Sequence, residues 1–208
     1  MEYKPQVEEE HYFEKSYLAS DRWANFWHQI HAVRSLRQKS VLEIGVGSGI
    51  VTEVLKKIGM SVMTLDIDKN LRPDVIGSIT AIPFPDASTD VVLAAEILEH
   101  IPFDEFPLAL REMHRVSRRY AYITLPYPGY TFSCTWKIPF FPRFSFIFKI
   151  PFFWKRSTST PEHYWELRLR GFPLRRIKKE IHRAGFMVVR KAVYPDDPAH
   201  YHFLLEKK

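Results

Sequence analysis

The chain has 208 residues, of which 46% are hydrophobic and 26% are charged, as is ordinary for one folded domain of generous size. Its single cysteine, Cys134, excludes an internal disulfide framework, and the first fifteen residues lack the apolar stretch of a secretory signal. Both observations predict a cytoplasmic protein. The net charge of +6 is uneven: residues 1–100 hold ten basic and fifteen acidic side chains, whereas residues 101–208 hold twenty and nine. A basic half indicates an anionic partner or, equally, a solvated basic helix face.

Apolar residues at helical spacing predict a first helix over residues 21–36, with Asp21 as a candidate N-cap. From residue 40 onward, short apolar runs alternate with amphipathic stretches. The predicted strands cover residues 40–45, 61–66, 74–79, 89–96, 120–126, 187–195 and 201–208. The predicted helices between them cover residues 50–59, 104–117 and 173–186, the last with Pro173 at its start and Gly185 at its end.

Strands that alternate with helices are typical of a parallel sheet covered on both faces. The last two predicted strands are joined by residues 196–200 alone. This connection is too short for a crossover helix, so the two strands must pair antiparallel. The sequence therefore predicts an α/β fold whose sheet is mostly parallel and contains one reversed strand near its end.

The stretch LEIGVGSG, residues 42–49, places Glu43 and the glycines Gly45, Gly47 and Gly49 between the first strand and its helix. Glycines allow a tight turn and a close approach to a ligand, and free N–H groups at a helix start face that ligand. The third glycine comes one residue too early for the dinucleotide fingerprint, which favours a different nucleoside. Asp66 ends the second strand, where a carboxylate can accept hydrogen bonds from both hydroxyls of a ribose. The plain alternatives are that the glycines form only a tight turn, and that Asp66 caps a helix or lies in solvent.

These motifs, together with TLDID at residues 64–68 and IPFPDASTDVVLAAEILEHI at residues 82–101, resemble the class I S-adenosylmethionine-dependent methyltransferases, and most of all the small methyltransferase type 11 group. The resemblance covers about residues 25–125. It implies a Rossmann-like, seven-stranded, mostly parallel sheet with a reversed terminal strand. It also implies S-adenosyl-L-methionine as cofactor and S-adenosyl-L-homocysteine as product.

The resemblance also implies roles for individual residues. The methionine part of the cofactor would be surrounded by the first motif, and the ribose would be bound by the acid that ends the second strand, with the next residue beside the adenine. The backbone after the fourth strand would line the cofactor. Ser78 stands where many relatives carry an acid that reaches the adenine, so the adenine contact is the weakest match. The cofactor-binding candidates are Glu43, Gly45, Gly47, Gly49, Asp66, Ile67, Ser78, Ile79 and Glu96.

Glu99 and His100 follow the fourth strand, where open α/β sheets place their ligands. Either side chain could act as a base or position the acceptor, although both could simply cap and pack a helix. His163 is a further candidate, with a structural role favoured. We expect no metal site, because the chain has no H-x-x-x-H motif and no cysteine pair. The sequence argues against a nucleic-acid substrate, since the Pro-Pro-aromatic motif of amino methyltransferases of nucleic acids is absent after the fourth strand.

Residues 137–156 read KIPFFPRFSFIFKIPFFWKR and contain the pentapeptide KIPFF twice. The cations Lys137, Arg143, Lys149 and Lys155 and three prolines interrupt this stretch, so it does not span a membrane. We interpret residues 127–160 as an aromatic cover over the acceptor site. Its aromatic side chains would face an apolar acceptor, a partner subunit or a lipid surface, and its cations would make weak contact with anionic membranes. The alternative is that these aromatics pack on the sheet.

The sequence thus predicts one methyltransferase domain over residues 1–208. We divide it into an N-terminal helical cover (1–38), a cofactor-binding core (39–126), the aromatic insertion after the fifth strand (127–160), and a C-terminal helix with a strand pair (161–208). The predicted activity is methyl transfer to a small-molecule, lipid-like or glycan-linked acceptor, with O-methylation favoured over N-methylation. The alternative is a non-catalytic module that keeps the fold and binds a membrane or a protein.

Overall fold

The computed structural model describes residues 12, 14, 17, 19–142 and 144–208. Its centre is a seven-stranded sheet with the strand order β3-β2-β1-β4-β5-β9-β8. The parallel strands are β1 (Ser40–Ile44), β2 (Ser61–Asp66), β3 (Val75–Ile76), β4 (Thr89–Ala95) and β5 (Ser117–Pro126). The predicted α/β fold with a mostly parallel sheet is therefore confirmed.

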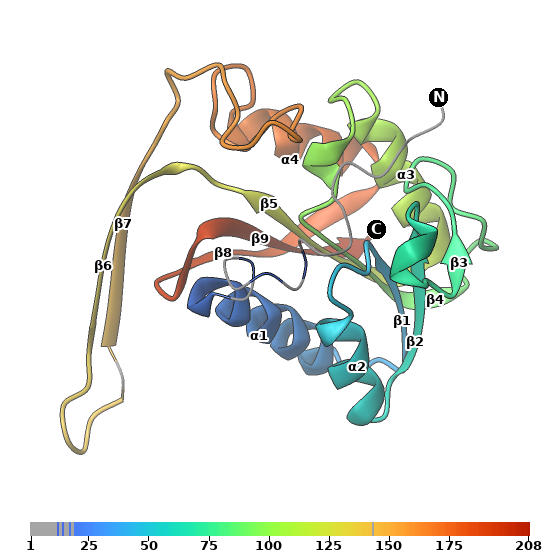
Figure 1. Cartoon of the computed structure of the whole chain (residues 1–208), viewed down its shortest axis with the longest axis horizontal. Helices are drawn as coiled ribbons and strands as arrows, with labels where there is room; N and C mark the ends of the chain where they lie inside the picture. Colours follow the sequence, from blue (N-terminus) through green and yellow to red (C-terminus); the bar gives the residue numbers. More distant parts are fainter. Residues whose placement is uncertain (1–11, 13, 15–16, 18, 143) are drawn as a thin grey trace.

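Helices cover both faces of this sheet (Figure 1). On one face lie α1 (Ser20–Ser35) and α2 (Ile50–Lys57), and on the other lie α3 (Phe106–Val116) and α4 (Leu174–Arg183). Successive strand residues point to opposite faces: Val41 packs with the α1 and α2 side, whereas Leu42 packs with the α3 and α4 side. The short apolar runs in the sequence are continuous because both faces of these strands are buried.

The helix ends differ slightly from the sequence prediction. The predicted cap at Asp21 is wrong: α1 begins at Ser20 with Ala19 in the N-cap position, and the Asp21 carboxylate accepts a hydrogen bond from the backbone N–H of Arg22 at 2.9 Å. For α4 the prediction is confirmed, since Pro173 occupies the N-cap position and Gly185 follows the helix with φ +98°. Two single-turn 3₁₀ helices, Lys69–Leu71 and Leu98–His100, follow β2 and β4.

The closing strands confirm the predicted reversal. The strand β9 (Asp197–Lys207) lies between β5 and β8 (Phe186–Tyr194) and is antiparallel to both. It begins four residues before the predicted start at 201, so the connection from β8 is a turn at residues 195–196. This earlier start brings the first residues of β9 to the edge of the sheet where the parallel strands end.

The aromatic segment forms a hairpin of β6 (Gly129–Trp136) and β7 (Phe144–Pro151), which we call the arm. The arm projects from the body of the molecule, at the left of Figure 1. Residues paired across the two strands share a face, and one face carries the pairs Tyr130–Ile150, Phe132–Phe148, Cys134–Phe146 and Trp136–Phe144. The opposite face carries Thr131–Lys149, Ser133–Ile147 and Thr135–Ser145.

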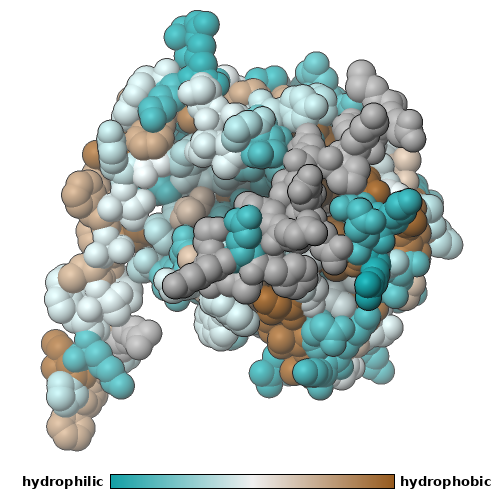
Figure 2. Space-filling view, viewed as in Figure 1, coloured by the Kyte–Doolittle hydropathy of each residue, from teal (hydrophilic) through white to brown (hydrophobic). Residues whose placement is uncertain are grey.

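The apolar face of the arm is exposed rather than packed on the sheet. Phe132 and Phe144 keep 61% and 66% of their surface accessible, and Figure 2 shows apolar residues on the projecting part at the lower left. The alternative that the arm aromatics pack on the sheet is therefore wrong. Arg143, one of the cations in this segment, lies outside the described residues. Across the part of the chain that the structure describes, no helix is long and apolar enough to cross a membrane.

Candidate functional site

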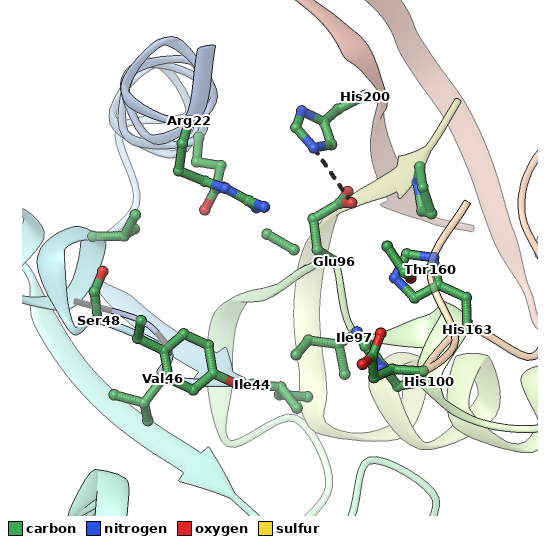
Figure 3. A pocket seen from close by; sticks show the side chains of 18 of the residues that line it. Arg22, Ile44, Val46, Ser48, Glu96, Ile97, His100, Thr160, His163 and His200 are labelled. Carbon is green, nitrogen blue, oxygen red and sulfur yellow. Dashed lines mark ion pairs between the residues drawn. The ribbon is translucent and has the colours of Figure 1, made fainter. Parts of the chain in front are cut away.

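A cavity of about 650 Å³ opens at the carboxyl ends of β1, β2 and β4. Open α/β sheets place their ligands at this edge. Segments far apart in the sequence form its wall: the β1–α2 loop, the end of β2, residues 95–101 after β4, the base of the arm, residues 159–166 and the first residues of β9. Arg22 of α1 points into it from the opposite side (Figure 3).

The glycine loop after β1 depends on backbone conformations and close contacts that other residues resist. Gly45 has φ +83°, and a Cβ atom there would overlap the side chain of Ile97. Gly47 has φ +51°, which is also in the left-handed region that favours glycine. Both residues line the cavity, whereas Gly49 is the N-cap residue of α2 and lies outside the cavity wall. The predicted tight turn against a ligand site is thus present.

Glu43 lies on β1 directly below this loop and is 5% exposed. Its Oε2 atom accepts a hydrogen bond from the hydroxyl of Thr52 on α2. Burial raises the pKa of the Glu43 carboxyl to about 7, because a low-dielectric surrounding disfavours the charged form. A cation placed in the cavity beside Glu43 would favour ionisation of this carboxyl.

Asp66 ends β2 and lines the cavity, as predicted. Its Oδ2 atom accepts a hydrogen bond from the backbone N–H of Val46 at 2.8 Å, and its Oδ1 atom accepts one from the N–H of Asp68 at 2.9 Å. Burial raises the pKa of Asp66. An ionised carboxylate offers about four acceptor positions, so Asp66 can hold the glycine loop and still accept hydrogen bonds from a ligand.

The three remaining candidates near β2 and β3 also line the cavity: Ile67, Ser78 and Ile79. Ile79 is buried. The Ser78 hydroxyl lies 2.8 Å from the hydroxyl of Thr80 and accepts a hydrogen bond from the Thr80 backbone N–H at 3.2 Å. Ser78 is therefore held within its own turn, and its hydroxyl is partly engaged before any ligand binds.

Glu96 follows β4 with a backbone φ of +54°, although it is not glycine. Such strain persists where the surroundings impose it and is typical of functional sites. Thr124 on β5 supplies the constraint: its hydroxyl accepts from the Glu96 N–H at 3.1 Å and donates to the Glu96 Oε1 atom at 2.8 Å. The Oε2 atom of Glu96 lies 3.5 Å from the Nε2 atom of His200 (Figure 3).

The structure places only one of the two predicted catalytic residues in the cavity wall. His100 lines the cavity, whereas Glu99 is fully buried and lies outside the cavity wall. Burial raises the pKa of Glu99 well above its usual value and lowers the pKa of His100 to about 4. His163 does line the cavity, and its ring lies 4.9 Å from the ring of His100.

Two further polar residues of the cavity wall, Glu166 and His200, were missed by the sequence analysis, and a third, Lys149, was expected to contact a membrane instead. Glu166 is buried and pairs with His163 only three positions away, so the H-x-x-E spacing was a usable signal. The Lys149 ammonium lies 4.5 Å from the centre of the Tyr127 ring, and burial lowers its pKa to about 8. It forms part of the wall rather than of an outer basic surface.

His200 belongs to a buried network at the start of β9. Its Nδ1 atom pairs with one carboxylate oxygen of Asp197, while the other oxygen lies 2.7 Å from Nε2 of His202, whose Nδ1 atom lies 2.7 Å from the Tyr122 hydroxyl. Burial lowers the pKa of His200, but Glu96 and Asp197 outweigh it and the pKa is raised. The network was missed because residues 196–200 were interpreted as a connecting turn.

Comparisons with known proteins agree with this geometry. Residues 42–125 match the family model of a methyltransferase domain. A probable S-adenosylmethionine-dependent methyltransferase of Mycolicibacterium smegmatis is 30% identical over 93 residues. That stretch covers 37% of this chain and only 36% of the relative.

Solved structures match over much more of the chain. The magnesium protoporphyrin IX methyltransferase of Synechocystis, solved with bound S-adenosylhomocysteine, is 13% identical with a TM-score of 0.61 over 91% of this chain and 86% of that one. A Pyrococcus horikoshii protein is 12% identical with a TM-score of 0.62 over 97% and 100%. The expected resemblance is confirmed: residues 42–125 match a methyltransferase domain, and the chain has the fold of these solved structures.

Proposed function

We propose that this protein transfers the methyl group of S-adenosylmethionine to a small-molecule acceptor. The observation that carries the proposal is one continuous cavity with two chemically different sides. The first side is the glycine loop with Glu43 and Asp66, and the second is a wall that contains His100, His163 and His200. Methyl transfer from a sulfonium needs donor and acceptor aligned in line, and such alignment contributes about 7–11 kcal/mol.

The cofactor occupies the first side in this proposal. The residues that hold it are those implied by the family resemblance, and their geometry supports these roles. Asp66 keeps acceptor positions for the ribose hydroxyls, and Ile67 and Ile79 offer apolar surface to the adenine. Glu43, whose pKa is raised to about 7 by burial, gains a cationic neighbour when the methionine amino group is bound. Cofactor binding then lowers the pKa of this carboxyl and favours its ionised form.

The acceptor occupies the second side, and we propose that its methylated atom is oxygen rather than nitrogen. A hydroxyl must lose its proton during transfer, and a positioned base accelerates this by about 10²–10⁴-fold. His100, His163 and His200 all reach the cavity, whereas Glu99 does not. The geometry therefore favours a histidine over Glu99 for direct contact with the acceptor.

The position of the arm favours a lipid-like acceptor, and we propose that the arm makes peripheral contact with an anionic membrane. Its base contributes Gly129, Thr131 and Lys149 to the cavity wall, and its apolar face is exposed. A membrane-bound arm would therefore place the cavity entrance beside the lipid surface. Lys137 and Lys155 are exposed, and each cation near an anionic surface contributes about 1 kcal/mol.

A transfer assay with tritium-labelled S-adenosylmethionine tests the activity. The acceptor panel contains matched pairs of apolar alcohols and amines, presented in anionic and in neutral vesicles. We expect label in the alcohols and more of it in anionic vesicles. Preferential labelling of the amines would overturn O-methylation, and equal labelling in both vesicle types would overturn the membrane contact.

The same assay, combined with calorimetry, distinguishes the methyltransferase from the alternative of a non-catalytic module. Binding of S-adenosylhomocysteine without transfer to any acceptor class would favour the module, which would then act through the arm. Absence of binding would remove the cofactor proposal itself.

A further inference from the structure

Three side chains with metal-binding atoms meet beside the cavity: Glu99, which is buried behind the wall, and His100 and His163, which belong to it. One potential ligand atom from each lies within 4.8 Å of the other two. Glu99 and His100 come from the 3₁₀ turn after β4, whereas His163 comes from the loop between the arm and α4. The fold thus brings together two segments more than sixty residues apart.

Glu99 provides the strongest indication that a ligand is expected here. Its side chain is 0% exposed, and both of its carboxylate oxygens lack a hydrogen-bond partner among the described residues. A carboxylate buried in this state is unfavourable unless a cation or a hydrogen-bond donor compensates its charge. Its Oε1 atom lies 4.0 Å from the Nε2 atom of His163. Two ligands of a tetrahedral zinc ion lie about 3.4 Å apart, so the two side chains would move slightly closer when they bind one ion.

The imidazole of His163 is oriented by a carboxylate at its second ring nitrogen, as metal-bound histidines are. Its Nδ1 atom lies 2.6 Å from the Oε1 atom of Glu166, so Nε2 is directed toward Glu99. Glu166 is itself fixed by hydrogen bonds of 2.8 Å from the backbone N–H and the hydroxyl of Ser159. Metal-bound histidines almost always donate their second ring nitrogen to such a carboxylate or carbonyl.

We propose that Glu99, His100 and His163 bind a divalent first-row transition metal ion, with Zn²⁺ as the test ion. One carboxylate oxygen and two imidazole nitrogens suit such ions, whereas Ca²⁺ and Mg²⁺ favour ligand sets made of oxygen alone. Three protein ligands leave a fourth position, as in catalytic zinc sites. Both histidines line the cavity, so that position faces the acceptor side. This departs from the absence of a metal site expected from local sequence motifs.

The consequence for catalysis rests on the proposed function. A metal ion at this position would bind an acceptor hydroxyl and favour transfer of its proton to His200, the histidine of the wall that is not a metal ligand, before the methyl group is transferred. The metal site itself does not depend on that activity. Its test therefore measures metal binding directly and keeps the two proposals separable.

The experiment uses untagged, chelator-treated protein with Cys134→Ser as the common background, because Cys134 is an exposed free thiol that could bind metal. Co²⁺ is titrated and followed by its visible absorption, and Zn²⁺ affinity is measured by competition with the bound Co²⁺. We expect one ion per chain. Glu99→Gln and His163→Gln should each weaken binding at least 100-fold, and His31→Gln, a change at an exposed histidine of α1, should change it less than threefold.

Glu166→Gln tests the positioning of His163. Loss of such an outer carboxylate lowers metal affinity by about 10–100-fold, and the Co²⁺ spectrum should shift because the ring orientation changes. Circular dichroism melting confirms that each variant is folded. The proposal is overturned if the background protein binds neither ion at equimolar ratio, or if folded Glu99→Gln and His163→Gln variants bind as tightly as the background. Normal binding of S-adenosylhomocysteine in that case would leave the proposed function standing.

Discussion

Replacing Asp66 by alanine should weaken cofactor binding more than it weakens the fold. In the proposed complex, the carboxylate accepts hydrogen bonds from the ribose, and loss of a hydrogen bond to a charged acceptor costs about 1.5–3 kcal/mol. This corresponds to a roughly 10- to 150-fold loss of affinity. The substitution also removes the acceptor for the N–H groups of Val46 and Asp68, so part of the effect acts through the glycine loop.

A matched control separates these two contributions. Asp74 also accepts two hydrogen bonds from β2, from the N–H and the hydroxyl of Thr64 at 2.9 Å each, but it lies outside the cavity wall. Asp74→Ala should therefore lower the melting temperature by a similar amount and leave ligand affinity unchanged.

The assay is calorimetric titration with S-adenosylhomocysteine at fixed pH. A change of less than threefold for folded Asp66→Ala would refute the proposed ribose contact. An equal loss of affinity in Asp66→Ala and Asp74→Ala would show that the effect comes from the fold.

Three further changes give expected outcomes. Gly47→Val should abolish binding of S-adenosylhomocysteine in calorimetry while circular dichroism stays normal, because a branched residue resists φ +51° beside the ligand. Asp90→Asn should lower the free energy of unfolding by about 1–3 kcal/mol at pH 7, because Ser40 and Arg118 donate to this carboxylate. Although burial raises its pKa, those hydrogen bonds lower it from 3.8 to about 2, so this contribution is present above about pH 4 and is lost as the pH falls through 2. Phe146→Ser on the arm should reduce co-sedimentation with anionic vesicles and leave cofactor binding unchanged.

Each of these outcomes has a result that would contradict it. Normal ligand binding by folded Gly47→Val would reduce the glycine loop to a plain turn. A stability difference between wild type and Asp90→Asn that persists below pH 2 would assign the effect to packing rather than to charge. Vesicle binding of Phe146→Ser equal to wild type, with Ser133→Ala on the opposite face of the arm as control, would remove the apolar face as the contact surface.

The sheet was predictable because its signals are local. The residues 40–45 and 61–66 are apolar runs bounded by polar residues and glycine, and both became strands within one residue of the prediction. The weak run at 74–79 became the two-residue strand Val75–Ile76, since few of its side chains meet the core. The antiparallel pairing of the last two strands followed from the length of their connection alone, because a short connection permits no other pairing.

The residues of the cavity wall were predictable only where a single short segment of sequence marks them. Glu43 and Asp66 are marked by position at strand ends, and both line the cavity. The pairing of Glu99 with His163 depends on how the loop after the arm folds back, for which the sequence contains no periodic signal. His200 lay in a stretch assigned to a turn. Its partner Glu96 is 104 positions away along the chain, so only the three-dimensional structure brings them together.

The order of the strands has a consequence for biosynthesis. Among the described residues, β8 joins the sheet through β9 alone, and about seventy residues of chain separate β9 from its partner β5. During translation, β1 to β5 can assemble early, but β8 has no partner until the ribosome has released residues 197–207. His200 lies on that last strand, so the histidine wall stays incomplete until then. A nascent chain stalled shortly before β9 should therefore hold the glycine loop and Asp66 without a closed acceptor side.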